Sequence, residues 1–124
     1  MAANRTQRYR LHLWEPGDNF LREEFNENFE ALDAVPEAVT GTYIGDGAGR
    51  QFIVLGFTPK AVLAGARGSL GAGGGGLTLP GHPCYAVSHG VKVLESAEGG
   101  FYAFKDSWGS ANDSGSAYHY LAIR

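Results

Sequence analysis

Residues 18–36 read Asp18-Asn-Phe-Leu-Arg-Glu-Glu-Phe-Asn-Glu-Asn-Phe-Glu-Ala-Leu-Asp-Ala-Val-Pro36, and this stretch divides the chain into a helical part and a β-rich part. Its large apolar residues follow one another in steps of four, four, three and three, which keeps them on one stripe of a helix. They are Leu21, Phe25, Phe29, Leu32 and Val35. Asp18 is a favourable N-cap, and Pro36 is incompatible with a continuing helix. The pattern predicts a helix over about 19–35.

The apolar stripe of this helix requires a cover, because the remaining faces are acidic and an isolated helix of this length is marginal in water. Two covers are conceivable, namely the β-rich part of the same chain or further copies of the chain. The stripe is too large to leave exposed and too narrow to form the core of a monomer. We therefore predict a C3 homotrimer, with a parallel helical bundle that buries the stripe of every copy.

From residue 39 onward, short runs rich in Val, Ile, Tyr and Phe alternate with glycine-containing turns, which indicates strands. The expected strands cover residues 39–44, 50–55, 60–64, 85–88, 91–95, 101–105 and 117–123. Regular short strands with polar turns favour a mainly β fold, with a small antiparallel β-sandwich or jelly-roll-like head or an open barrel. We expect an attachment segment at 1–17, a helical trimerisation stalk at 18–38 and the head at 39–124.

Length and composition restrict the function further. A chain of 124 residues accommodates one domain and a short appendage. Its net charge of −3 argues against a dedicated nucleic-acid binder, which needs a basic face. The chain lacks an apolar run of the roughly 18 residues that cross a bilayer, and its polar N-terminus has no signal-peptide core. We expect no membrane insertion, no signal peptide and synthesis in the cytoplasm.

Motifs for cofactor or metal chemistry are weak. Gly71–Gly76 formally matches a dinucleotide-binding glycine pattern, but Leu77-Thr-Leu-Pro80 follows it and cannot open a helix. This glycine stretch is either flexible or holds its backbone at positive φ in close contacts. His82 and Cys84 could supply metal ligands on a symmetry axis, but their spacing does not support a metal site. We expect no cofactor.

Enzymatic chemistry has two candidate sets of residues. Cys84 lies near two histidines and is either a nucleophile or, as we expect, a small buried hydrophobe. The four carboxylates of Glu95, Glu98, Asp106 and Asp113 could include a glycosidase pair, but they fall at strand ends and in turns, where charges are simply solvated. We therefore expect no enzymatic activity.

Residues 106–116 have the composition of a binding loop, because one large aromatic residue stands among short polar ones. Trp108 supplies contact area, while Asp106, Asn112 and Asp113 supply adaptable hydrogen bonds. Alternatively, Trp108 folds back over the edge of the core. We assign these four residues, together with Tyr102, to a receptor-binding site.

The last expected strand contains Tyr118-His119-Tyr120, whose alternation turns both tyrosines to one face and His119 to the other. One of these faces belongs to the core. In a domain that associates with its own copies, the other face is an interface, and we therefore add His119 to the predicted trimer interface.

The chain resembles tail fibre and receptor-binding proteins from phages and prophages of Gram-positive gut bacteria. Residues 5–33 match their N-terminal pattern W-x-x-x-D-x-x-L-R-E-x-F-N-x-N-x-x-x-I-D, beginning at Trp14. The stretches 41–47, 55–62, 76–83 and 118–124 resemble the β head that follows, so the resemblance spans nearly the whole chain. Residues between Ala64 and Leu77 and residues 105–116 match no fixed pattern and would be the variable loops.

The resemblance implies a component of the phage tail in the virion. Such a protein is a homotrimer with a helical stalk and a distal β head that adheres to a cell-surface receptor. Residues 1–17, with Arg5, Arg8, Arg10 and Trp14, would attach to other tail or baseplate proteins. The resemblance carries over no catalytic residue.

We arrive at three hypotheses for the function. The first is a tail-tip adhesin that binds a host surface glycan or glycopolymer. The second is a purely structural tail or baseplate component without receptor contact, and the third is a small glycan-cleaving tail enzyme. An exposed aromatic residue in the Trp108 loop would favour the adhesin, wholly polar loops the structural component, and a groove with paired carboxylates the enzyme.

Overall fold

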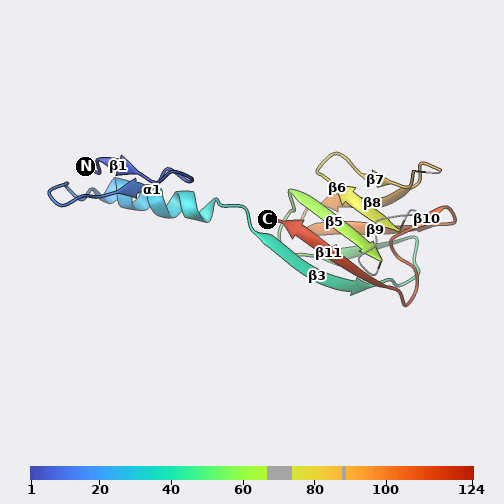
Figure 1. Cartoon of the computed structure of the whole chain (residues 1–124). Coiled ribbons are helices and arrows are strands. Elements are labelled where there is room, and N and C mark those ends of the chain that lie inside the picture. The colour runs from blue at the N-terminus through green and yellow to red at the C-terminus, as the bar shows by residue number, and fades with distance from the viewer. Residues whose placement is uncertain (67–73, 88) are drawn as a thin grey trace. The chain divides into compact units, whose positions relative to one another are not determined.

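The computed structural model describes residues 1–66, 74–87 and 89–124 (Figure 1). It contains two compact units, Met1–Pro36 and Glu37–Arg124. The first unit holds α1 (Arg22–Asp33) and a hairpin of two short strands, β1 (Asn4–Arg5) and β2 (His12–Leu13). Every other strand of the described residues belongs to the second unit, and α1 is the single helix among them. Residues 1–17 thus belong to the same unit as the helix.

The helix is shorter than the predicted range of about 19–35. Its N-cap is Leu21, which makes no side-chain capping hydrogen bond. Asp18, which was predicted to be the N-cap, lies three residues before Leu21. Its Oδ2 instead accepts hydrogen bonds from the backbone N–H groups of Glu15 (2.8 Å) and Ala3 (3.1 Å). These two donors also lower the pKa of the Asp18 carboxyl group. At the other end the helix stops at Asp33, since Pro36 disfavours helical backbone in the residue before it.

The β1–β2 hairpin docks on one face of α1 through His12, a contact that the sequence patterns did not indicate. The buried imidazole places Nδ1 2.8 Å from Glu24 Oε2 and Nε2 2.6 Å from Glu27 Oε2. The backbone N–H of His12 donates to Asn28 Oδ1 (2.6 Å), and Asn28 Nδ2 donates to the carbonyl oxygen of His12 (3.1 Å). The spacing i, i+3, i+4 places these three partners on one helical face.

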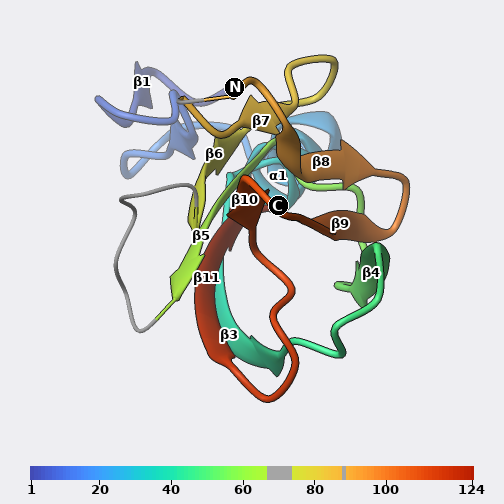
Figure 2. The same cartoon turned by 90° about the vertical axis from the view of Figure 1, so that its right-hand side faces the viewer.

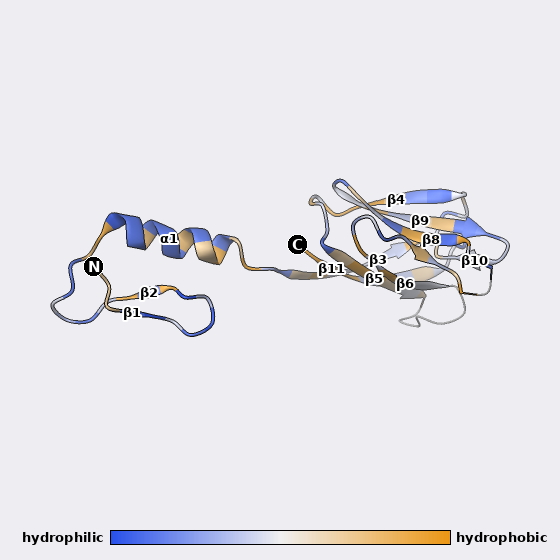
Figure 3. Cartoon of the chain, turned by 90° about the horizontal axis from the view of Figure 1, so that it is seen from above, coloured by the Kyte–Doolittle hydropathy of each residue, from blue (hydrophilic) through white to orange (hydrophobic). Residues whose placement is uncertain are grey.

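The predicted apolar stripe lies on a neighbouring face of α1 and stays exposed within the first unit. Between 41% and 57% of the surface of Leu21, Phe25, Phe29 and Leu32 is accessible. The rings of Phe25 and Phe29 meet edge to face, with centroids 4.7 Å apart. Figure 3 shows the resulting alternation of hydrophobic and hydrophilic segments along α1. The hairpin therefore does not supply the cover that the stripe requires.

Two antiparallel sheets form most of the second unit (Figure 2). The first has the order β3-β11-β5-β6, with strands Ala38–Ile44, Ala117–Ile123, Ala61–Ala66 and Gly75–Thr78. The second has the order β10-β9-β8-β7, and β4 also pairs with β9. Its strands are Gly109–Ser110, Gly100–Asp106, Lys92–Ala97, Cys84–Tyr85 and Arg50–Val54. Neither sheet closes into a barrel within the described residues, and the predicted mainly β, antiparallel fold is confirmed.

The core combines side chains from both sheets and is centred on aromatic residues. Tyr43 of β3 and Tyr118 of β11 stack with ring centroids 5.0 Å apart, and Phe101 of β9 meets Tyr43 edge to face at 5.8 Å. Both tyrosine hydroxyl groups reach the loop before β11. The Tyr43 hydroxyl donates to the carbonyl oxygen of Ala111 (2.8 Å), and the Tyr118 hydroxyl accepts from the N–H of Asp113 (2.9 Å). The core thereby positions the loop that follows Trp108.

The strand β6 was not expected from the sequence, because glycine has neither periodicity nor strand propensity. It forms where the chain needs a close approach. A Cβ atom on Gly75 would overlap the carbonyl oxygen of Ala64 in β5 and lie 2.7 Å from Gly65 Cα. Gly75 is therefore tightly packed, which agrees with the close-contact alternative for the glycine stretch and not with the flexible one. Gly71–Gly73 lie outside the described residues.

Candidate functional site

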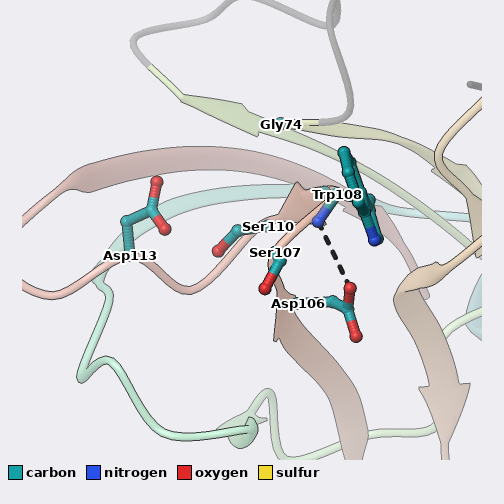
Figure 4. Close-up of a pocket in the computed structure, with 7 residues that line it drawn as sticks. Gly74, Asp106, Ser107, Trp108, Ser110 and Asp113 are labelled. Atoms are coloured by element: carbon teal, nitrogen blue, oxygen red, sulfur yellow. Dashed lines mark hydrogen bonds between the residues drawn. The ribbon is translucent and has the colours of Figure 1, made fainter. Parts of the chain in front are cut away.

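Residues of the predicted binding loop line a solvent-open pocket of about 320 Å³ (Figure 4). Its walls consist of Gly74, Asp106, Ser107, Trp108, Gly109, Ser110 and Asp113. Three of the five residues assigned to the site from the sequence, Asp106, Trp108 and Asp113, are therefore brought together here. The other four lining residues were not assigned, although three of them belong to the same stretch as Trp108; they are Gly74, Ser107, Gly109 and Ser110.

A tight hairpin turn presents Trp108 at this pocket. Asp106 and Gly109 pair across β9 and β10, and Asp106 Oδ1 accepts a hydrogen bond from the N–H of Trp108 (3.2 Å). Gly109 seats the turn against the core, since a Cβ there would lie 2.7 Å from Ala86 Cβ. The indole consequently stands out from the head with 59% of its surface exposed, so it does not fold back over the edge of the core.

One face of the Trp108 indole is already occupied. The imidazole of His89, from the segment between β7 and β8, stacks on it with a centroid distance of 4.0 Å and an interplanar angle of 16°. A flat ligand therefore has only the opposite face for stacking. The role of His89 was not foreseen, because it comes from a different turn and no spacing in the sequence links it to Trp108.

Asn112 does not line the pocket, contrary to its assignment from the sequence. Its side chain is fully buried, and its Nδ2 donates to Asp46 Oδ1 (2.6 Å) and to the carbonyl oxygen of Ala48 (3.0 Å). Its Oδ1 accepts from the N–H of Asp46 (3.1 Å). All of these hydrogen bonds join the loop before β11 to the turn between β3 and β4, so Asn112 positions Asp113 without facing a ligand.

Tyr102 also lies away from this pocket. It belongs to the middle of β9, where its ring lies 5.0 Å from that of Phe52 and beneath the guanidinium of Arg50, whose Cζ is 4.7 Å from the ring centroid. Tyr102 therefore does not line the pocket of Trp108, and its assignment to the receptor-binding site stays a prediction. The alternation along β9 places it on the outer face of the sheet, whereas Trp108 stands at the end of the hairpin.

A second open pocket, of about 390 Å³, adjoins the first through Asp106 and Ser107. Gly47, Gly49 and Lys105 complete its lining. Asp106 therefore lies between two pockets, and a ligand larger than the first pocket has room to extend from the Trp108 side toward the β3–β4 turn.

Residues with potential nucleophilic or metal-binding chemistry do not assemble into a site. Cys84 is half-buried, and burial raises the pKa of its thiol, which disfavours a thiolate nucleophile. Its Sγ lies 3.8 Å from the carbonyl oxygen of Gly75. In the part of the chain that the structure describes, no three His, Cys, Asp or Glu side chains gather in a geometry that could hold a metal ion.

Comparison with known proteins finds no matching family model, and neither a curated protein nor a solved structure matches the chain. The described residues contain no helix whose length and hydropathy would let it span a bilayer.

Proposed function

We propose that this protein is a phage tail-tip adhesin whose head binds a glycan on the host cell surface. The observation that carries the proposal is an exposed tryptophan beside a polar pocket with two carboxylates and two hydroxyl groups, from Asp106, Asp113, Ser107 and Ser110. The resemblance to tail fibre proteins supports the same class. In this proposal the two sheets and their shared core form a sandwich-like head, and the protein resides in the virion.

A saccharide suits this site chemically. The apolar face of a pyranose ring can stack on the free face of the Trp108 indole, and its hydroxyl groups can donate hydrogen bonds to the carboxylates. Lining residues are otherwise small and polar, and the pocket is open, so it offers little apolar surface for burying a hydrophobic ligand. Binding to a single pocket of this kind is expected to be weak.

The proposal includes a homotrimer, because avidity compensates for weak single sites. The exposed stripe of Leu21, Phe25, Phe29 and Leu32 is the contact surface for a parallel bundle of α1. Attachment to other tail or baseplate proteins is assigned to the β1–β2 hairpin. Its turn carries Arg8, Tyr9 and Arg10, all exposed, and so offers a basic tip with an aromatic side chain.

The two rival functions account less well for the site. A purely structural tail component predicts wholly polar exposed loops, whereas Trp108 is 59% exposed beside the pocket. A glycosidase needs one carboxyl group in an apolar setting to act as the acid, whereas Asp106 and Asp113 are both exposed. The adhesin therefore remains the function that the site supports best.

The direct test is binding of the full chain to host cells and to a glycan array, comparing wild type with Trp108→Ala. We expect Trp108→Ala to lose binding and to keep its fold. The matched control is Phe52→Ala, which removes another exposed aromatic side chain from the outer face of β4, outside the pocket. Undiminished binding by Trp108→Ala would overturn the site, and equal losses in both variants would show that the pocket is not specific.

A further inference from the structure

Among the described residues, the outer face of the sheet β3-β11-β5-β6 carries no Asp, Glu, Lys or Arg, and its side chains are apolar except for Thr40, Thr42 and His119. Its positions are every second residue of β3 from Ala38 to Ile44 and of β11 from Ala117 to Ile123, with Ala61 and Leu63 of β5 and Leu77 of β6. Figure 1 shows these four strands side by side. The large side chains are substantially exposed, namely Ile44 by 57%, Leu63 by 37%, Leu77 by 53% and Leu121 by 38%.

Three of these leucines form a continuous row across the sheet. Leu121 pairs with Leu63, and Leu63 pairs with Leu77, so their side chains are direct cross-strand neighbours. The solvated face of an antiparallel sheet is normally polar, and a contiguous exposed apolar patch marks an interaction surface. The outer face of the other sheet is mixed, since the exposed Phe52 and Val54 lie beside Arg50 and the ion pair of Lys92 with Glu95 (2.9 Å). The two outer faces therefore differ in charge, and the described part of the face that carries the leucine row has none.

We infer that the outer face of β3-β11-β5-β6 packs against the heads of the other copies in the trimer. This inference rests on the proposed self-association through α1. The absence of charge matters here, because an uncharged face meets its own copy without like-charge repulsion and gives no selectivity for an acidic or basic partner. His119, predicted from the sequence to lie in the trimer interface, is exposed on this same face, opposite Thr42 of β3.

Chain connectivity also favours a second copy as the occupant. β3 begins at Ala38, so only the four residues 34–37 separate it from the end of α1 at Asp33. Four residues span at most about 14 Å. Copies joined through α1 therefore hold their heads at a high effective concentration, in the millimolar range for short linkers. Under that condition a weak apolar contact between heads forms before a separate partner can compete for the face.

Sedimentation velocity of full-length variants over about 0.1–100 µM tests the inference. Phe25→Asp weakens the α1 contact, and Leu121→Lys places a charge in the middle of the uncharged face. The matched control is Val54→Lys, which introduces the same charge on the other sheet, where Val54 is 74% exposed. We expect Phe25→Asp to retain association at high concentration, and Phe25→Asp/Leu121→Lys to sediment as a 13.2 kDa monomer throughout. We expect Phe25→Asp/Val54→Lys to behave like Phe25→Asp.

The possible failures can be told apart. If Phe25→Asp dissociates the protein completely, or if the Leu121→Lys and Val54→Lys variants sediment alike, the head contact is refuted while the α1 contact stands. A wild-type protein that is monomeric at every concentration refutes both contacts. If Leu121→Lys disturbs the circular dichroism spectrum, Ile44→Lys on the same face replaces it, because Ile44 is more exposed. These variants do not test adhesion through Trp108, which the Trp108→Ala variant tests independently.

Discussion

The buried side chain of Asn112 fixes the position of the predicted binding loop through its hydrogen bonds to the β3–β4 turn. Composition predicted a binding loop at residues 106–116, and three of the residues assigned to it, Asp106, Trp108 and Asp113, line one pocket. It could not show that Asn112 points inward, because a loop has no periodicity and the partner Asp46 is 66 residues away. At the scale of single residues, the sequence thus indicates which chemistry is present but not which side chain serves the fold.

Asn112→Ala should destabilise the head by about 2 kcal/mol, because it removes the three hydrogen bonds that the fully buried Asn112 side chain makes to Asp46 and Ala48. The loop that carries Asp113 should also lose its fixed position, so glycan binding should weaken. Urea unfolding measures the first effect. Ser114→Ala, at an exposed position of the same loop, is the control and should change the free energy of unfolding little. Equal stability of the two variants would contradict the structural role of Asn112.

The carboxylate of Asp46 makes the stability of this region pH-dependent. Its pKa is lowered, first by the hydrogen bond from the N–H of Ala48 and then by that from Asn112. A pKa below its unfolded value means that Asp46 stabilises the fold at neutral pH, and that this contribution disappears as the pH falls below about 4. The stability difference between wild type and Asp46→Ala should therefore be largest above pH 5 and shrink toward pH 3. A difference that stays constant over this range would refute the assignment.

At the scale of elements, periodicity located most strands and the helix but not their partners. The seven predicted strands correspond to β3, β4, β5, β7, β8, β9 and β11. The strand β6 was missed because close backbone contact, rather than a repeated side-chain pattern, places Gly75 beside β5. The docking of the hairpin on α1 was missed because His12, Glu24 and Glu27 form no recognisable spacing across a turn.

Gly75→Ala should destabilise the head by about 1–3 kcal/mol, because the added methyl group forces the backbone of β5 to move. Gly49→Ala is the matched control, since a Cβ atom there meets nothing within 4 Å. It should leave stability unchanged or raise it slightly by restricting the unfolded chain. Thermal melts decide the matter, and an unchanged or higher melting temperature for Gly75→Ala would exclude the packed arrangement of β6.

His12→Ala should release the β1–β2 hairpin from α1, because it leaves the carboxylates of Glu24 and Glu27 on one face without the imidazole that bridges them. Trypsin should then cleave after Arg8 and Arg10 faster than in wild type, while the melting of the head stays the same. His82→Ala, at an exposed position of the other unit, serves as the control and should leave the cleavage rate unchanged. Slow cleavage in both variants would show that other contacts hold the hairpin.

At the scale of the whole molecule, each unit taken by itself leaves large apolar side chains exposed, on the stripe of α1 in the first and on the outer face of β3-β11-β5-β6 in the second. Periodicity predicted the stripe, since its residues are close in sequence. The sheet face could not be predicted, because it depends on the order in which β3, β11, β5 and β6 pair. Association of three copies would bury both surfaces. Light scattering of wild type should therefore give three times the chain mass of 13.2 kDa. A mass near that of one chain at micromolar concentration would rule out the trimer.

Adhesion should depend on this assembly, because a trimer presents three Trp108 pockets at once. Linked binding sites exceed the affinity of one site by about 10²–10⁴-fold. We therefore expect the monomeric variant Phe25→Asp/Leu121→Lys to lose about that factor in apparent affinity for host cells while keeping the weak affinity of one pocket for soluble glycan. Trp108→Ala should remain trimeric and lose both activities. If the monomeric variant adheres as strongly as wild type, avidity plays no part, and one head is sufficient to hold the receptor.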